Sequence, residues 1–132
     1  MLSASFNRLV RLQNRVMSTL VSTFQDVRSA KSKNILVIDV REPQELQETG
    51  QIEGSVNIPV DVLEQVFSNF STEKFKSVYG ENKPDFDTPM IVSCRSGKRS
   101  LLSQDILKKL GYKNVSNYSG GWLDWEKNIN QN

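Results

Sequence analysis

One short segment of the chain concentrates groups that could support nucleophilic chemistry, and it reads Cys94-Arg95-Ser96-Gly97-Lys98-Arg99-Ser100. Cysteine is nucleophilic as a thiolate, whereas a free cysteine is mostly protonated at neutral pH. Three nearby cations, the amide groups at the start of a following helix and a backbone curl at glycine would all stabilise the thiolate. The segment therefore predicts a catalytic Cys94 beside a pocket for a small anionic substrate. The predicted binding residues are Arg95, Ser96, Gly97, Lys98 and Arg99.

The alternative interpretation treats Cys94 as a small hydrophobic residue of the core, as lone cysteines often are. Three positively charged residues within the next five positions are poor neighbours for a buried apolar side chain. The functional interpretation is therefore favoured.

Two residue counts restrict the available chemistry further. The chain contains no histidine, which excludes Ser-His-Asp triads, Cys-His pairs and histidine-ligated metals. It contains one cysteine, which excludes an internal disulfide, a CxxC redox pair and a multi-cysteine metal site. A free thiol is typical of a reducing compartment. We therefore expect neither a metal nor a cofactor.

Overall charge and hydropathy argue against two classes of partner. The chain carries 17 basic and 15 acidic residues, a net charge of +2, which is too balanced for a protein built to bind nucleic acid. Its apolar runs are a few residues long, far below the roughly 20 residues of a membrane span. We expect neither nucleic-acid binding nor a transmembrane segment.

The charge is unevenly distributed, because residues 1–33 contain six basic residues and one acidic residue. On a helical wheel, Arg8, Arg11 and Arg15 fall within about 60° of one another, and the apolar residues occupy a separate arc. An amphipathic, arginine-bearing start without acidic residues predicts a mitochondrial transit peptide over residues 1–17. An amphipathic helix packed on the domain is the alternative, and Met17 as a second start would yield a cytoplasmic form. Residues 18–132 are predicted to form one domain.

From residue 34 onward, the pattern alternates between strands and helices. Strands are expected at 35–39, 55–58, 90–93 and 115–118. Helices are expected at 43–49, at 62–67 after an Asp61 cap, at 71–79, at 98–110 with Leu102, Ile106 and Leu110 on its apolar face, and at 122–128. This alternation predicts an α/β fold, a parallel sheet with helices on both faces. Ligands of such sheets bind at the carboxyl ends of strands, where Cys94 is expected.

Three separated motifs resemble those of the rhodanese-domain family. Ile38-Asp39-Val40-Arg41-Glu42-Pro43, with Glu45 and the segment 50–59, resembles the first family signature. Residues 94–99 resemble the six-residue active-site loop, and Gly120-Gly121-Trp122 with Trp125 the C-terminal signature. The similarity covers residues 20 to 128. An insert at 75–84 resembles the small single-domain thiosulfate sulfurtransferases, including those that use glutathione.

The resemblance implies a rhodanese-like fold and a two-step sulfur transfer. Cys94 would take the sulfane sulfur of thiosulfate or a related persulfide donor, and the amide groups of residues 95–99 would hold the resulting persulfide. A thiol such as glutathione or a thioredoxin-like protein, or cyanide, would then accept the sulfur. Asp39 and Arg41 match family positions beside the loop and would orient it or contact substrate, unless they form a strand-end ion pair. A monomer is expected.

Two rival functions remain. A related phosphatase would need Cys-x5-Arg, but the sixth position after Cys94 is Ser100 and the arginine comes one residue early, at Arg99. The loop from Cys94 to Arg99 should therefore be too short to close around a phosphate group. A non-catalytic binding or sulfur-relay module is the other alternative, although such modules often lose the cysteine. Trp122 and Trp125 are expected to pack in the core.

Overall fold

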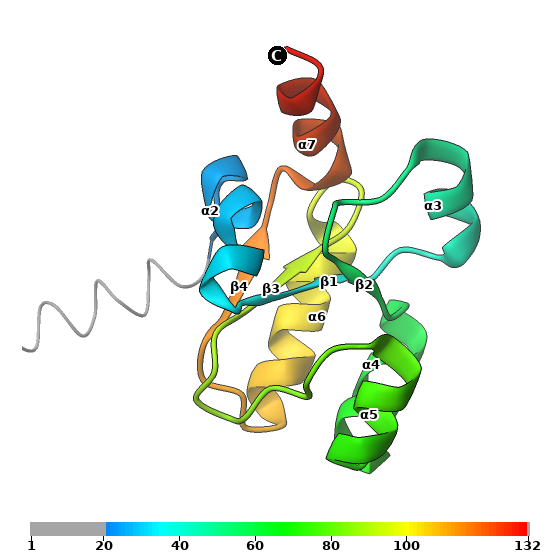
Figure 1. The fold of residues 1–132 in the computed structure, drawn as a ribbon, viewed down its shortest axis with the longest axis vertical. Coiled ribbons are helices and arrows are strands. Elements are labelled where there is room, and N and C mark those ends of the chain that lie inside the picture. Colours follow the sequence, from blue (N-terminus) through cyan, green and yellow to red (C-terminus); the bar gives the residue numbers. More distant parts are fainter. Residues whose placement is uncertain (1–20, 132) are drawn as a thin grey trace, which may run out of the picture.

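The computed structural model describes residues 21–131, so the predicted transit peptide, Met17 and the predicted domain start at residue 18 lie outside the described residues. The described chain alternates between strands and helices (Figure 1). In chain order the elements are α2 (Phe24–Ser29), the 3-10 helix η1 (Lys31–Lys33), β1 (Leu36–Asp39), α3 (Pro43–Thr49), β2 (Val56–Asn57), α4 (Val60–Asn69), α5 (Thr72–Tyr79), β3 (Met90–Ser93), α6 (Lys98–Lys109), β4 (Val115–Tyr118) and α7 (Gly121–Ile129).

The four strands form one parallel sheet in the order β2-β1-β3-β4. Asp39 pairs in register with Ser93, which pairs in turn with Tyr118. The chain therefore leaves β1, β3 and β4 at the same edge of the sheet. Cys94 directly follows the central strand β3 at this edge, the usual ligand-binding position of a parallel α/β sheet.

Helices cover both faces of the sheet, which confirms the predicted fold class (Figure 1). Adjacent residues of a strand point to opposite faces, and Val37 and Ile38 of β1 accordingly enter two different hydrophobic clusters. The larger cluster joins the sheet to α4, α5 and α6, and the smaller joins it to α2 and α7. Trp122 and Trp125 are buried in the smaller cluster, as expected.

The start of α4 differs from the prediction. The helix begins at Val60 after Pro59, whereas the sequence predicted a start at Val62 after an Asp61 cap. Pro59 has φ −54° and an extended ψ of 146°, so it takes the capping position itself. Asp61 lies within the first turn, where its negative charge complements the helix dipole.

The buried face of α6 also differs from the prediction. Leu102 is 53% exposed, and the buried residues are Ser100, Ser103, Gln104 and Leu107. The polar side chains of this face are satisfied internally, since Gln104 Nε2 donates to the Val115 carbonyl at 2.8 Å and Ser103 Oγ donates to the Arg99 carbonyl at 2.8 Å. The small side chains of Ser100 and Ser103 let the first turns of α6 lie close to the sheet and to Cys94.

Within residues 21–131, no helix has the length and apolar character that a membrane span requires.

Candidate active site

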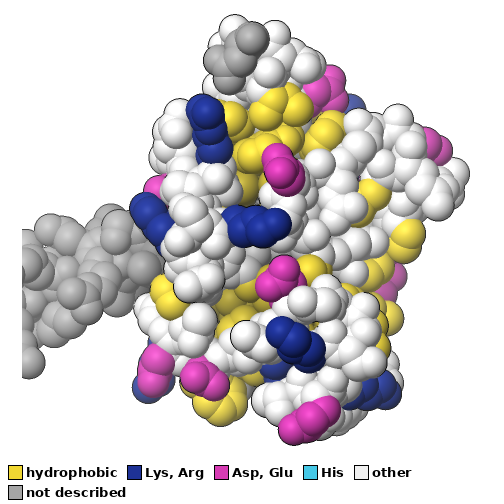
Figure 2. Space-filling model, viewed as in Figure 1, with side chains coloured by type: hydrophobic (Ala, Val, Ile, Leu, Met, Phe, Trp, Pro, Cys, Tyr) yellow, Lys and Arg dark blue, Asp and Glu magenta, His cyan; other side chains and the backbone are white. Residues whose placement is uncertain are grey.

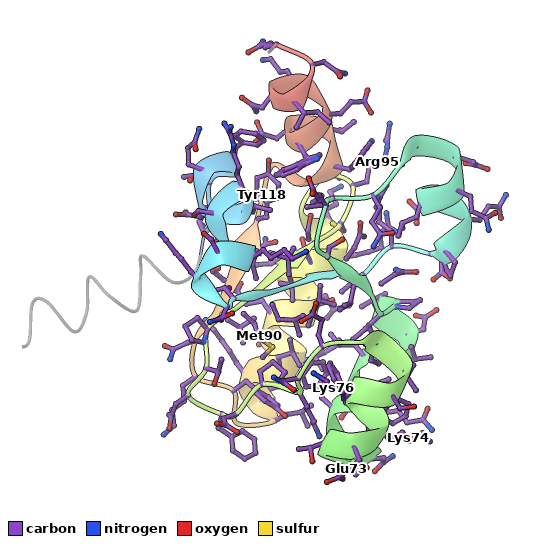
Figure 3. All side chains as sticks on the ribbon, viewed as in Figure 1. Glu73, Lys74, Lys76, Met90, Arg95 and Tyr118 are labelled. Atoms are coloured by element: carbon purple, nitrogen blue, oxygen red, sulfur yellow. The ribbon has the colours of Figure 1, made fainter. Side chains whose placement is uncertain are left out.

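Cys94 lies in the turn that connects β3 to α6, and its side chain is 1% exposed. Figure 3 labels Met90 at one end of β3 and Arg95 just past the other end, where the Arg95 side chain extends away from the sheet. The strand is buried along its whole length, and its first three residues are apolar, so it fixes where the turn begins. The position of the sulfur is thus set by the core of the domain.

The sulfur of Cys94 receives hydrogen bonds from the turn that follows it. The Gly97 amide donates to Sγ at 3.1 Å, and Ser100 Oγ lies 3.3 Å from Sγ. Burial raises the pKa of the Cys94 thiol, but hydrogen bonds from the Ser100 hydroxyl and from the amides of Ser100, Gly97 and Ser96 outweigh it. The net pKa lies below that of an ordinary cysteine. The sequence predicts that amides at the start of the helix, the backbone curl at Gly97 and the three cations lower this pKa together. The amide contributions agree with that prediction, the Ser100 hydroxyl adds to them, and the main causes include none of the three cations.

Gly97 permits the tight turn on which these bonds depend. Its φ of 96° is left-handed, and it forms the N-terminal cap of α6. A Cβ atom here would lie 2.5 Å from the Ser119 carbonyl oxygen. The buried Asn117 side chain donates to the Gly97 carbonyl at 3.3 Å, which ties the turn to β4.

The three basic residues of the loop have different surroundings. Arg95 and Lys98 are exposed and make no ion pair with any residue from 21 to 131, so their charges face solvent beside Cys94. Arg99 instead points to α3, where both of its terminal nitrogens donate to the Glu45 carboxylate, at 2.6 and 2.9 Å. The hydrogen bond from Arg99 is the main reason that the pKa of Glu45 falls to about 2. Over the face shown in Figure 2, basic and acidic side chains are interspersed.

The first turn of α7 braces the loop through backbone contacts. The Trp122 amide donates to the Cys94 carbonyl at 2.8 Å, and the Leu123 amide donates to the Arg95 carbonyl at 3.3 Å. Gly121 has a left-handed φ of 60°, and a Cβ there would lie 2.5 Å from both carbonyl oxygens. Only glycine allows this approach, so the glycine pair before Trp122 has a structural role next to the Cys94 sulfur.

Asp39 and Arg41 form an ion pair at the end of β1, and both side chains are 1% exposed. Arg41 Nη2 donates to Asp39 Oδ2 at 2.7 Å, and Arg41 also donates to the Thr49 hydroxyl and the Gly50 carbonyl at the end of α3. Its guanidinium lies 5.1 Å from the centre of the Trp122 ring. Among the described residues, no hydrogen bond or ion pair joins either side chain to residues 94–100, although the charge of Asp39 contributes to the raised pKa of Arg99. The geometry favours the strand-end ion pair over a substrate contact.

Two residues of the site were not singled out from the sequence. Ser100 was treated only as the residue that breaks a phosphatase motif, and Glu45 only as part of a signature. The available signal for Ser100 was its place in the first turn of the helix after Cys94, where a hydroxyl can turn back to the preceding loop. No local signal pairs Glu45 with Arg99, because they are 54 residues apart in the chain.

Known proteins share both the sequence and the fold. The family described as "Rhodanese-like domain" matches residues 23–128. A protein of Schizosaccharomyces pombe named "Putative thiosulfate sulfurtransferase, mitochondrial" is 42% identical over 95% of this chain and 94% of its own length. The human "Thiosulfate:glutathione sulfurtransferase" is 33% identical over 67% of this chain and 76% of its own length.

Among solved structures, the human single-domain sulfurtransferase TSTD1 superposes with a TM-score of 0.72 and 28% identity, covering 81% of this chain and 95% of that one. The family match spans all four strands, the loop of residues 94–99, and the motifs at 38–59 and 120–125. On this evidence the chain belongs to the family of rhodanese-like domains.

Proposed function

We propose that this protein is a sulfurtransferase that moves the sulfane sulfur of thiosulfate, through a persulfide on Cys94, to a thiol such as glutathione. The observation that carries the proposal is the environment of Cys94. Its sulfur is buried and is hydrogen-bonded by Gly97 and Ser100, and the pKa of its thiol is lowered. Sulfurtransferases among its relatives support the class of reaction.

In the first step, the Cys94 thiolate attacks the outer sulfur of thiosulfate. A sulfur–sulfur bond forms to Cys94 while the bond to the sulfonate sulfur breaks, and sulfite leaves with the electron pair. The charge is conserved, since a thiolate and a dianion yield a persulfide anion and a dianion. No proton has to be removed from a thiolate, so the absence of histidine from the chain is no obstacle.

The exposed Arg95 and Lys98 would attract the anionic donor to the loop. Sulfur acceptance adds one atom beyond Sγ, and we expect it to lie on the side from which the amides of Ser96, Gly97 and Ser100 act on the sulfur. Those amides would stabilise the negative outer sulfur as they stabilise the thiolate. The binding roles of Ser96 and Gly97 therefore depend mainly on the backbone, whereas Arg95 and Lys98 contribute charge.

In the second step, an acceptor thiolate attacks the outer sulfur, takes it as its own persulfide and restores Cys94. The chain holds one cysteine, so the persulfide has no internal thiol onto which it can pass. Glutathione is the acceptor in the name of one human relative, and this supports a small thiol here. Cyanide and a thioredoxin-like protein are the other acceptors to be compared.

We also place the activity in mitochondria. The basic, amphipathic segment 1–17 supports this location, as does the mitochondrial designation in the name of the relative from Schizosaccharomyces pombe. A cytoplasmic form starting at Met17 is the alternative.

The direct experiment is intact mass spectrometry of the purified protein after incubation with thiosulfate. We expect the mass to increase by one sulfur atom, the increase to disappear with dithiothreitol or glutathione, and Cys94→Ser to show none. An unchanged mass together with hydrolysis of p-nitrophenyl phosphate would instead support the phosphatase alternative. An unchanged mass without hydrolysis would support a non-catalytic module.

A further inference from the structure

The ion pair between Arg99 and Glu45 fixes one of the three cations of the active-site loop. Arg99 Nη1 lies 2.6 Å from Glu45 Oε2, and Nη2 lies 2.9 Å from Oε1. Two parallel hydrogen bonds hold a guanidinium in both direction and plane, which a single contact does not. The side chain of Arg99 is 35% exposed and that of Glu45 29% exposed, so the pair is partly shielded from solvent.

Glu45 is itself held in place by the start of α3. Its Oε2 accepts a hydrogen bond from the Glu42 amide at 2.8 Å, as part of the capping box of that helix. Pro43 in the first turn restricts the backbone there. The capping box therefore positions the carboxylate independently of Arg99, and the ion pair is a well-defined contact between α3 and the loop.

An unpaired Arg99 would add an anion-binding group to the site. Arg99 directly precedes Ser100, whose hydroxyl contacts the Cys94 sulfur. The hydrogen bond to Glu45 is the main cause of the raised pKa of Arg99, and the charge of Cys94 also contributes. The guanidinium is therefore within electrostatic reach of the sulfur. A free guanidinium binds tetrahedral oxyanions through the same two donors that Glu45 now occupies.

We propose that Glu45 is a positioning residue, which occupies both terminal donors of Arg99 so that tetrahedral oxyanions such as inorganic phosphate bind poorly at the loop. The inference rests on the proposed function, in which Arg95 and Lys98 suffice to attract the donor. It assigns to α3 a role in limiting anion binding at the loop, although α3 carries no reacting group.

The test measures phosphate binding to the 132-residue chain by calorimetry, without a sulfur donor, so it does not depend on sulfur transfer. Glu45→Gln weakens the hold on Arg99 and Glu45→Ala removes it. We expect phosphate affinity to rise in that order, by about tenfold for the alanine variant, the size of effect that one hydrogen bond to a charged group supports. Glu48→Gln is the matched control, because Glu48 lies on the same helix and contacts Gln44.

The double variant Glu45→Ala/Arg99→Gln identifies the group responsible, since its phosphate affinity should return to the wild-type value. Unchanged phosphate affinity in both Glu45 variants would overturn the proposal, as would a gain that persists in the double variant or occurs equally in Glu48→Gln. Persulfide formation by the wild-type protein, followed separately by mass, shows whether the proposed function itself has failed.

Discussion

At the scale of single residues, the proposed chemistry depends on what surrounds the sulfur atom of Cys94. Cys94 is as buried as a core residue, and burial alone would keep it protonated. The amides of Ser96, Gly97 and Ser100 and the Ser100 hydroxyl reverse this effect. Among these groups, the Ser100 hydroxyl is the one that a conservative substitution can remove, because the others belong to the backbone.

We expect Ser100→Ala to slow sulfur transfer from thiosulfate about tenfold, because a hydrogen bond to an ionised group contributes roughly 1.5–3 kcal/mol. The same bond stabilises the thiolate form, so its loss raises the pKa of Cys94. The pH midpoint of alkylation by iodoacetamide should therefore lie below that of a simple thiol in the wild-type protein and move upward in the variant.

Ser103→Ala is the matched control for that substitution. Ser103 is also fully buried on α6, but its hydroxyl donates to the Arg99 carbonyl and not to the sulfur. Its alkylation profile should match the wild-type profile, and Ser100→Thr should restore part of the loss. Equal midpoints in wild type and Ser100→Ala would show that the hydroxyl does not stabilise the thiolate.

At the scale of elements, the loop after β3 is held from two sides. The first turn of α7 donates two amide hydrogen bonds to the carbonyls of Cys94 and Arg95, and α3 holds the side chain of Arg99. Neither element supplies an atom that reacts. Both constrain the loop from which the sulfur receives its hydrogen bonds.

We expect Gly121→Ala to abolish persulfide formation and to destabilise the fold. A Cβ at this position would meet two loop carbonyls at 2.5 Å, so the loop or α7 must shift. The left-handed backbone alone costs an alanine roughly 1–2 kcal/mol. The measurements are urea unfolding and the mass increase with thiosulfate.

Gly80→Ala separates the two causes. Gly80 has a similar left-handed φ of 75°, but no atom lies within 4 Å of the added Cβ. This variant should lose about the same 1–2 kcal/mol of conformational stability and keep full activity. If both variants retained persulfide formation equally, the close approach of α7 would have no role in the site.

At the scale of the whole molecule, the buried pair Asp39–Arg41 connects parts of the chain that carry the site. Arg41 joins the end of β1 to the end of α3 and lies against Trp122 of α7. Arg41→Ala should destabilise the protein by roughly 3–5 kcal/mol, because the Asp39 carboxylate would stay buried without its partner. Urea unfolding measures this loss.

Lys109→Ala provides the comparison, since it removes an exposed ion pair with Asp105 that contributes only about 0.3–0.5 kcal/mol. If Arg41 were instead a substrate contact, Arg41→Ala would raise the KM for thiosulfate and leave the unfolding midpoint unchanged.

The segment before the domain leads to a prediction about location in the cell. Deletion of residues 1–16 should move the protein from mitochondria to the cytosol, because the arginines and apolar residues of the amphipathic pattern are removed together. Fluorescence of a C-terminal fusion measures this. A deletion variant that stays in mitochondria would contradict the assignment of residues 1–17 as a transit peptide.

Much of the architecture follows from local patterns in the sequence. The apolar run before Cys94 forms a buried parallel strand, and the regions predicted as strands at 35–39 and 115–118 contain β1 and β4. The predicted helix of residues 71–79 is α5, which begins after a Ser71 cap and ends at Gly80. These features depend on side-chain periodicity and on caps within a few residues, which a sequence displays directly.

Only the tertiary structure decided which groups meet at the sulfur. Glu45 reaches Arg99 across 54 positions. The start of α7 meets the loop because β4 pairs beside β3 and ends at the same edge of the sheet. The apolar spacing of residues 98–110 predicted only part of the buried face of α6. Leu107 and Leu110 pack in the core, but Leu102 is exposed. The rest of the buried face consists of polar side chains that bond within the domain. Such contacts arise from the packing of elements that are distant in the chain, and local periodicity carries no information about them.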